Sequence, residues 1–246
     1  YLNIICLFTI SPANLLKNYQ IGTKFELFLV HLPRNRLSMH KNHNITAYRF
    51  ELRQKILRTA MLLFRTQGIK NVKMDDISAH MGISKRTLYE IYDNKEQLLL
   101  EAVKFAHEES EHEMADFVNE KERNEIEVMV KFVTMQLRNL KDVNPLFFSE
   151  SHRYKAILEY LQNHHEQKRK RTIDFIMTGV KNGYFKAYLN YDIVEDMCDA
   201  IMNHVMETRL YEKYPIEEIF RNYISVIMWG YCTEKGIREL NKLIDI

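Results

Sequence analysis

Four side chains that can donate hydrogen bonds to nucleic acid follow directly after Ser84, namely Lys85, Arg86, Thr87 and Tyr89. Serine is a preferred N-cap residue, so the sequence predicts that a helix begins at this point. Such a helix presents the four side chains together at its N-terminal end, where a helix in the DNA major groove places its base contacts. The positive end of a helix also favours phosphate. The pattern therefore indicates contact with DNA.

The residues around this segment predict two short helices joined at a glycine. Gly82 is suited to the left-handed conformation that ends a helix. Apolar residues three or four positions apart give each helix one buried face, and a further apolar residue in the turn closes a small core. These residues are Ile77, Met81, Ile83, Leu88 and Ile91. The expected result is a helix-turn-helix unit.

Composition favours an all-α chain with one small DNA-reading domain and one larger helical domain. The chain has 246 residues, 46% of them hydrophobic, with only 7 glycines and 4 prolines. The net charge of +2 gives no argument for nucleic acid, but its distribution does. Cations without acids lie between His31 and Arg49, whereas residues 108–127 are rich in acids. This asymmetry directs the N-terminal end toward DNA.

Motifs for enzymatic chemistry are missing from the sequence. It contains no Gly-rich phosphate loop, nucleophile elbow, paired catalytic carboxylates or cysteine and histidine pattern for zinc. His107 lies four residues before Glu111, and His152, His164 and His165 are near one another in sequence, yet no third metal ligand has suitable spacing. We therefore expect no catalytic activity, no metal and no cofactor. An enzyme would need a cluster of perturbed titratable groups in a cleft.

The cysteines and the hydropathy indicate a cytoplasmic protein. Cys6, Cys198 and Cys232 are odd in number and lack metal-ligand spacing, which favours free thiols in a reducing compartment. No apolar run approaches the roughly 20 residues that span a bilayer. The apolar stretch from Ile4 to Ile10 is not preceded by a cation, so we do not expect it to be a signal peptide.

From Leu52 to Leu99 the chain resembles the DNA-binding domain of the tetracycline-repressor-like (TetR) family of bacterial regulators. The resemblance rests on Ile56, Ala60, Phe64, Gly68, Asp76, Ile77, Gly82, Ile83, Ser84, Leu88, Tyr89, Tyr92, Lys95, Glu96 and Leu98. It implies that Thr87, Tyr89 and Lys95 contact phosphates, while Lys85 and Arg86 contact base edges or the backbone. The predicted DNA-binding set is Lys73, Ser84, Lys85, Arg86, Thr87, Tyr89, Tyr92 and Lys95.

Two members of this set depart from the pattern of the family. Lys73 stands where a helix-capping threonine is common, and Tyr92 stands where phenylalanine is usual. Without a side-chain acceptor at position 73, the second helix of the unit loses about 1 kcal/mol of capping if nothing replaces it. In exchange, Lys73 adds a cation near the DNA backbone.

The chain divides into three predicted regions. Residues 1–46 form a tail that is either an upstream extension absent from the native protein or a disordered segment, since residues 1–38 lie outside the resemblance and Met39 is the first methionine. A role of Arg34 and Arg36 in a minor groove is the alternative. Residues 47–106 form the helix-turn-helix domain, and residues 107–246 form an effector-binding and dimerisation domain.

Apolar periodicity predicts the helices of both domains. The first covers residues 46–67. A helix capped by Asn94, with Gln97 three residues later, continues to about Phe117. Further helices are predicted over 126–137 with an end near 144–145, over 154–180 with a stop at 182–183, over 192–211 and over 216–231. A short helix through residues 147–148 lies between two of them. The basic run at 168–171 is interpreted as the solvated face of a long helix.

The resemblance also implies an effector cavity and a dimer interface in the larger domain. Phe132, Phe147, Phe148 and Phe175 lie on the helices that enclose the cavity in the family and are the predicted pocket residues. The last two predicted helices would form the four-helix bundle of a homodimer. Its predicted contacts are Ile201, His204, Phe220, Tyr223 and Ile227.

These observations predict a homodimeric transcriptional regulator that binds a palindromic double-stranded DNA operator. The favoured mechanism is repression that a small, mostly apolar effector relieves by shifting the dimer to the wrong separation of its recognition helices. The alternative is a DNA-binding regulator without a small-molecule effector, controlled by a protein partner at the acidic region 108–127 or at the basic run at 168–171.

Overall fold

The computed structural model describes the backbone of residues 42–243 and the side chains of 48–164 and 169–243. Apart from one isolated antiparallel bridge between Phe185 and Cys232, its regular elements are helical, which confirms the all-α prediction. None of the described helices is long and apolar enough to cross a membrane. Residues 1–41, including Arg34 and Arg36, and the Lys168 side chain lie outside the part described, whereas residues 42–46 of the predicted tail form the start of a helix.

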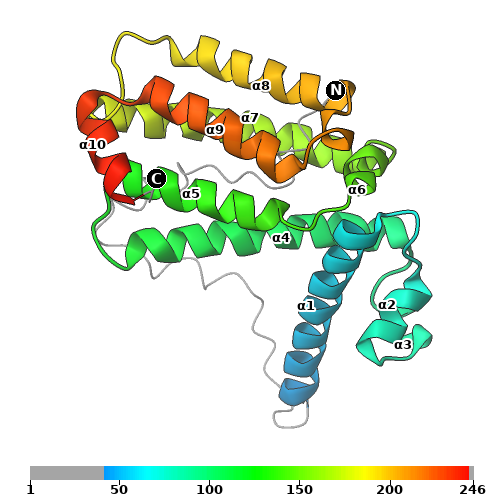
Figure 1. Cartoon of the computed structure of the whole chain (residues 1–246). Helices are drawn as coiled ribbons and strands as arrows, with labels where there is room; N and C mark the ends of the chain where they lie inside the picture. Colours follow the sequence, from blue (N-terminus) through cyan, green and yellow to red (C-terminus); the bar gives the residue numbers. More distant parts are fainter. Residues whose placement is uncertain (1–41, 244–246) are drawn as a thin grey trace.

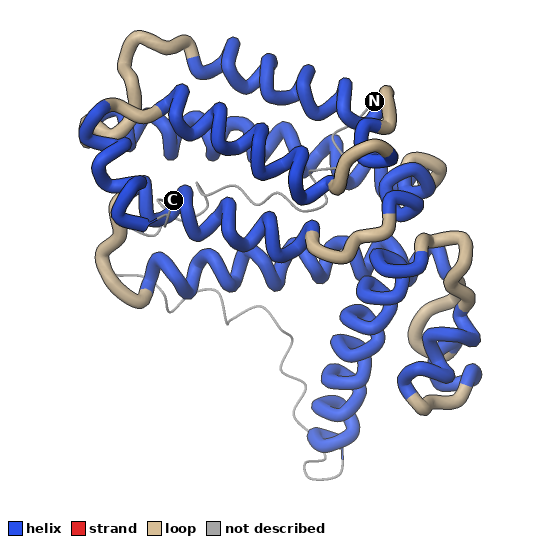
Figure 2. The backbone as a smooth tube through the Cα atoms, viewed as in Figure 1, coloured by secondary structure: helices blue, strands red, loops and turns tan. Residues whose placement is uncertain are grey.

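Figures 1 and 2 show a layered bundle of long helices with a smaller lobe at one end. The lobe contains most of α1 together with α2 and α3, and α4 runs from it into the bundle. The bounds are α1 Asn42–Gln67, α2 Met74–Met81, α3 Lys85–Tyr89, α4 Lys95–Asn119, α5 Glu125–Leu140, α6 Pro145–Ser151, α7 Lys155–Lys181, α8 Tyr191–Glu207, a 3-10 turn Leu210–Glu212, α9 Ile216–Tyr231 and α10 Glu234–Leu243.

Buried apolar residues form two clusters. The first, here called the proximal cluster, fills the lobe and continues into the adjoining half of the bundle, with Phe64, Leu88 and Phe147 as members. The second, the distal cluster, fills the far half of the bundle and includes Met129 and Phe175. The periodic apolar faces predicted from the sequence supply both clusters, because burial of such a face stabilises a helix more than its intrinsic propensity does.

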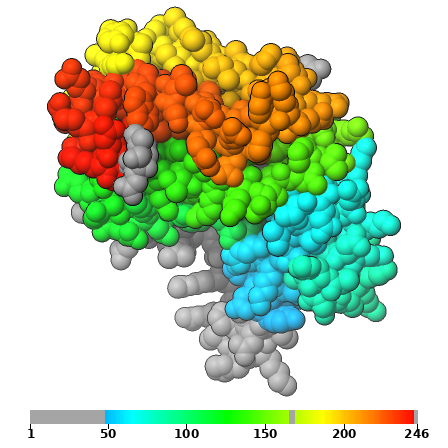
Figure 3. All heavy atoms as spheres, in the orientation of Figure 1, coloured from blue at the N-terminus to red at the C-terminus, as the bar shows by residue number. Residues whose placement is uncertain are grey.

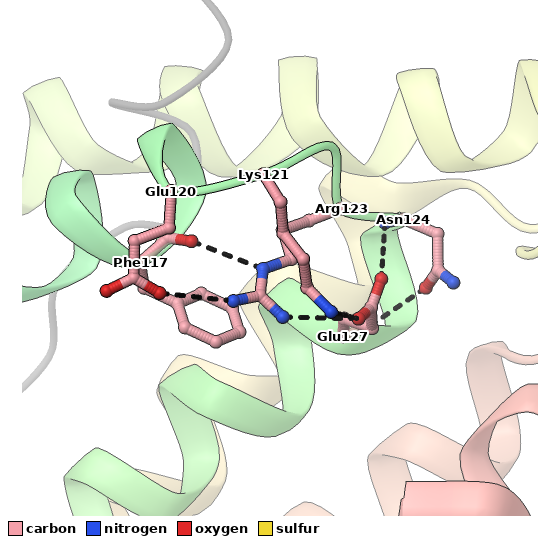
Figure 4. A network of polar contacts seen from close by, with 6 residues as sticks. All are labelled: Phe117, Glu120, Lys121, Arg123, Asn124 and Glu127. Atoms are coloured by element: carbon pink, nitrogen blue, oxygen red, sulfur yellow. Dashed lines mark hydrogen bonds and ion pairs between the residues drawn. The ribbon is translucent and has the colours of Figure 1, made fainter.

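The turn between α4 and α5 is fixed by a compact polar network (Figure 4). The Arg123 guanidinium stacks 3.9 Å from the ring centroid of Phe117 and donates to the backbone oxygen of that residue. It also forms ion pairs with Glu120 and Glu127, both at 3.4 Å. Asn124 accepts from the Glu127 backbone at 2.9 Å, and Glu127 accepts in return from the Asn124 backbone. This capping box starts α5 and fixes the sharp reversal of the chain.

A second joint connects the bundle to the lobe through α6. The Asn144 backbone N–H donates to the Arg65 carbonyl of α1 at 2.7 Å, and the Glu150 carboxylate accepts from the Lys70 backbone at 2.8 Å. Gly68 has a positive φ of 88°, and a Cβ there would lie 3.1 Å from Leu146. A glycine is therefore required where the lobe approaches α6.

Several predicted helix ends differ from those observed. The helix expected to reach Asn144 ends at Leu140, because Asn144 instead caps α6 and Pro145 occupies its first position. The helix expected to reach Tyr211 ends at Glu207. There Arg209 adopts a left-handed conformation, and Tyr211 turns inward to contact Phe148.

Helix α10 was not predicted. Its start depends on Thr233, whose hydroxyl accepts from the Gly236 backbone at 3.1 Å. A Cβ at Gly236 would lie 2.4 Å from the Tyr184 carbonyl, so this helix packs closely on a loop some fifty residues earlier. The predicted domain boundary at 106–107 falls within α4, which is continuous from Lys95 to Asn119. The division into domains stays a prediction.

Candidate nucleic-acid interface

The turn between α2 and α3 has the geometry that the sequence predicts. Gly82 ends α2 in the left-handed region with φ of 66°, and the Ile83 N–H donates to the Ser78 carbonyl at 3.0 Å. The Ser84 hydroxyl accepts from the Thr87 N–H at 3.0 Å and so caps α3. Leu88 is fully buried in the proximal cluster and anchors α3 to the lobe. In the space-filling view the lobe adjoins the bundle and projects from one end of it (Figure 3).

The outer face of α3 presents Lys85, Arg86 and Tyr89 to solvent, with Thr87 half-buried beside them. Lys85 pairs with Asp75 of α2, and this hydrogen bond raises the pKa of the Lys85 ammonium. Arg86 pairs with Glu90 at 2.9 Å, and the side chain of Tyr89 is 48% exposed. Both cations lie on exposed side chains, so they can exchange these carboxylates for DNA phosphates or base edges at little cost.

Lys95 is placed differently from the exposed cations of α3. Its ammonium, at the start of α4, donates to the carbonyls of Ile69 at 2.9 Å and Val72 at 3.0 Å. These bonds hold the loop between α1 and α2. An ammonium has three donors, so one N–H is left for an outside acceptor. Lys95 thus combines a structural role with the possibility of one phosphate contact.

Tyr92 belongs to the core and not to the exposed face. Its side chain is 1% exposed, and its hydroxyl accepts from the Arg53 guanidinium at 3.2 Å. Arg53 also pairs with Glu101 at 3.2 Å. Burial raises the pKa of the Tyr92 phenol, while Arg53 acts in the opposite direction. The structure therefore does not support a direct DNA contact from Tyr92. No spacing pattern in the sequence points to Arg53, which lies 39 residues before Tyr92.

Lys73 is exposed at the start of α2, and its side chain forms no capping bond. The Asp76 carboxylate accepts from the Lys73 backbone N–H at 2.8 Å, which is one half of a capping box. Part of the predicted loss of capping is thereby replaced. The Lys73 ammonium remains on the surface of the lobe, where a phosphate could reach it.

The four predicted pocket phenylalanines do not come together. Phe147 and Phe148 are fully buried in the proximal cluster, whereas Phe175 belongs to the distal cluster and Phe132 packs against it half-buried. Two cavities are found elsewhere. One of about 620 Å³ lies between α8 and α9, and one of about 410 Å³ lies where α1, α4 and α5 meet. None of the four phenylalanines lines either cavity.

The predicted dimer contacts lie on α8 and α9. Ile201 is 41% exposed, His204 is exposed, and Tyr223 and Ile227 are half-buried. Phe220 is only 2% exposed and packs in the proximal cluster, so its burial does not support the predicted interface contact, which stays a prediction. The exposed apolar face of these helices also includes residues that the sequence analysis missed, and they are Ile193, Met197, Val226 and Trp229.

Several histidines and cations of the bundle are paired internally. No group of three or more potential metal ligands occurs among the described side chains. The His107 ring nitrogen Nδ1 lies 3.0 Å from the Tyr160 hydroxyl, and its ring stacks on His164. In the basic run, Arg169 pairs with Asp196 of α8 at 2.6 Å, and Arg171 lies 3.9 Å from Glu111 of α4.

The capped, solvent-exposed α3 held against α2 by a glycine turn defines a helix-turn-helix DNA-binding domain. Residues 56–102 match the family model described as bacterial regulatory proteins, tetR family. The transcriptional repressor KstR2 of Mycobacterium tuberculosis is 22% identical over 192 residues, covering 75% of this chain and 94% of KstR2. Residues 56–102 thus match the DNA-binding domain of that family, and the chain is similar over most of its length to one of its repressors. The matched relative is named a transcriptional repressor, which agrees with the prediction of a regulator and not an enzyme.

Two further similarities agree with this assignment. The biofilm-operon negative regulator IcaR of Staphylococcus epidermidis is 38% identical over 52 residues, which is 21% of this chain and 28% of IcaR. A transcriptional regulator from Saccharomonospora viridis, solved in complex with choline, superposes with a TM-score of 0.60 at 21% identity. That superposition covers 75% of this chain and all of the other, and it shows the shared fold.

Proposed function

We propose that this DNA-binding regulator is a homodimeric repressor that binds a palindromic operator and leaves it when a small, mostly apolar effector binds. The observation that carries the proposal is the exposed face of α3, where Lys85, Arg86 and Tyr89 surround a helix anchored by buried Leu88. A rigid support beneath mobile polar side chains is what direct readout of base edges requires.

Contacts to phosphate would set the register of α3 in the groove. Thr87, Tyr89 and the remaining N–H of Lys95 are suited to this role, and Lys73 adds a further cation on the same lobe. Lys85 and Arg86 are the candidates for base edges. Each cation must first leave its carboxylate partner, so the DNA must offer at least comparable pairing.

Dimerisation is supported by the apolar face of α8 and α9. Ile193, Met197 and Val226 are more than half exposed, which is unusual for side chains of this kind on adjacent helices. A second copy related by a two-fold axis would cover this face. Two recognition helices would then enter successive major grooves, and the operator would share the symmetry of the dimer.

Helix α4 provides the mechanical link from the bundle to the lobe. It extends from Lys95, beside the DNA-reading helix, to Asn119 at the far end of the bundle. Two ion pairs join it to α1, Arg53 with Glu101 and Arg58 with Glu109. A ligand that displaces α4 within the bundle would therefore move α1 and the reading helix with it. Such a ligand releases DNA if it binds the displaced state better.

The structure favours the effector mechanism over control by a protein partner. Much of the acidic region at 108–127 is neutralised internally, since Glu113 pairs with Lys131 and Arg138, and Glu127 pairs with Arg123. Few of its charges remain for a basic partner. Because the target is DNA, we place the protein in the cytoplasm.

The test is binding of the full-length protein to labelled DNA from upstream of its own gene, over a salt series, together with a reporter for transcription. We expect salt-sensitive protection of a palindrome and higher transcription when the gene is deleted. Lower transcription on deletion would identify an activator instead. Co-purification of a protein partner that controls binding, without any stabilisation by apolar compounds, would favour the alternative.

A further inference from the structure

Gln136 of α5 is a buried polar side chain without a hydrogen-bond partner. It is 0% exposed, and within the described residues both its amide nitrogen and its amide oxygen are unpaired. No other buried side-chain nitrogen or oxygen in that part of the chain lacks a partner. Leaving a buried amide unpaired is strongly unfavourable, so native proteins pair nearly all such groups. Gln136 therefore indicates a partner outside the described residues.

Gln136 lies where α5 passes from the distal cluster to the proximal cluster. Met129 and Met135 of α5 belong to the distal cluster, whereas Leu140 belongs to the proximal cluster. Phe132, one helical turn before Gln136, packs half-buried against the distal cluster. The amide is thus bordered along α5 by large apolar side chains, two of them flexible methionines that adapt to irregular shapes.

Helices α4, α5 and α7 contact one another in the bundle (Figure 1). Glu113 of α4 bonds to Lys131 and Arg138 of α5, which lie on either side of Gln136 in sequence. His107, six residues before Glu113 on α4, is 3% exposed and meets Tyr160 of α7. These groups pair with one another across the helices. Gln136 of the same three-helix packing, in contrast, has no hydrogen-bond partner among the described residues.

We propose that the Gln136 amide is the polar anchor of the effector site and selects a mostly apolar ligand that carries an uncharged amide-type group. The inference rests on the effector binding proposed above. Both atoms of the amide need a partner, the nitrogen an acceptor and the oxygen a donor. A ligand amide offers the two side by side. A ketone satisfies only the nitrogen, and a carboxylate directs a second acceptor against the Gln136 oxygen.

The test compares three probes of similar length by calorimetric titration of the full-length protein: octanamide, 2-nonanone and octanoate. We expect octanamide to bind about tenfold more tightly than 2-nonanone, which corresponds to one additional hydrogen bond. Gln136→Met keeps the length of the side chain and should abolish this preference. The matched control is Gln162→Met, at an exposed position on α7, which should retain it.

Thermal unfolding without ligand provides a second readout. Because Gln136→Met removes an unpaired buried amide, it should raise the Tm by roughly 2–8 °C, whereas Gln162→Met should leave it unchanged. An unchanged or lower Tm for Gln136→Met would show that bound water already pairs with the amide, and would overturn the proposal.

The binding outcomes separate this proposal from the function it rests on. Equal affinity for the three probes, or a preference for 2-nonanone or octanoate, overturns the role of Gln136 and leaves effector binding in place. If none of the three probes binds, both the role of Gln136 and the effector mechanism are overturned. DNA binding is measured separately and decides whether the protein is a DNA-binding regulator.

Discussion

Lys95→Met tests whether a predicted phosphate contact also supports the fold of the lobe. Methionine keeps most of the apolar stem and removes the ammonium that donates to the carbonyls of Ile69 and Val72. Both of those residues are 0% exposed, so water reaches their carbonyls poorly. A hydrogen bond from a charged donor contributes about 1.5–3 kcal/mol, and partial exposure of Lys95 reduces this. For the pair of bonds we expect a total loss of about 1–3 kcal/mol.

The assay is urea unfolding followed by circular dichroism, with DNA binding measured over a salt series. For a chain of this size, the expected loss corresponds to roughly 2–4 °C in Tm per kcal/mol. If the third N–H of Lys95 contacts a phosphate, the variant also reduces the salt slope of DNA binding by about 1.

The matched control is Lys73→Met. Lys73 lies on the same lobe, but its side chain forms no hydrogen bond within it. We expect its stability to stay within about 0.5 kcal/mol of the parent, with a lower salt slope. Equal stability of the Lys95→Met protein and the parent would refute the structural role. A loss of stability with an unchanged salt slope would support the structural role of Lys95 and refute its phosphate contact.

Three further predictions follow from individual contacts. Ser84→Ala removes the cap of α3 and should lower stability by about 1 kcal/mol in urea unfolding and weaken DNA binding; unchanged DNA binding would contradict the role of that cap. Hydrogen bonding from Arg138 lowers the pKa of Glu113 from 4.5 to about 2. The resulting stability is present above pH 4.5 and is lost as the pH falls toward 2, an effect of about 1 kcal/mol after solvent screening that Glu113→Gln should abolish in acid titrations. Ile201→Glu should convert the dimer to monomer in light scattering with little change in monomer stability, whereas Phe220→Ala should destabilise the fold by about 3–5 kcal/mol; the reverse pattern would place Phe220 at the interface.

The local features of the reading unit could be predicted from the sequence because each depends on residues a few positions apart. Gly82 ends one helix, Ser84 caps the next, and Asn94 caps α4 by accepting from Gln97. These interactions are complete within four residues, so residue type and spacing determine them.

Features that depend on distant packing could not be predicted in this way. The exposed and buried sides of α8 and α9 both carry apolar residues, so periodicity alone did not place Phe220 inside and Ile201 outside. Tyr92 occupies a position of the family pattern in the helix-turn-helix unit. Its hydroxyl nevertheless accepts a hydrogen bond from Arg53 of α1, which is distant in sequence. No spacing pattern marks Gln136 as a binding residue. The only hint is that a polar residue lies four positions after Phe132 on a helix face predicted to be apolar.

The most direct test of the central claim is selection of binding sites by the full-length protein from a random DNA pool, followed by affinity measurements with two tyrosine variants. We expect a two-fold symmetric sequence to be enriched. Tyr89→Ala, on the exposed face of α3, should lose binding to it, while Tyr188→Ala, 79% exposed on the bundle, should not. Failure to enrich any sequence, or equal binding by both variants, would contradict DNA recognition through α3.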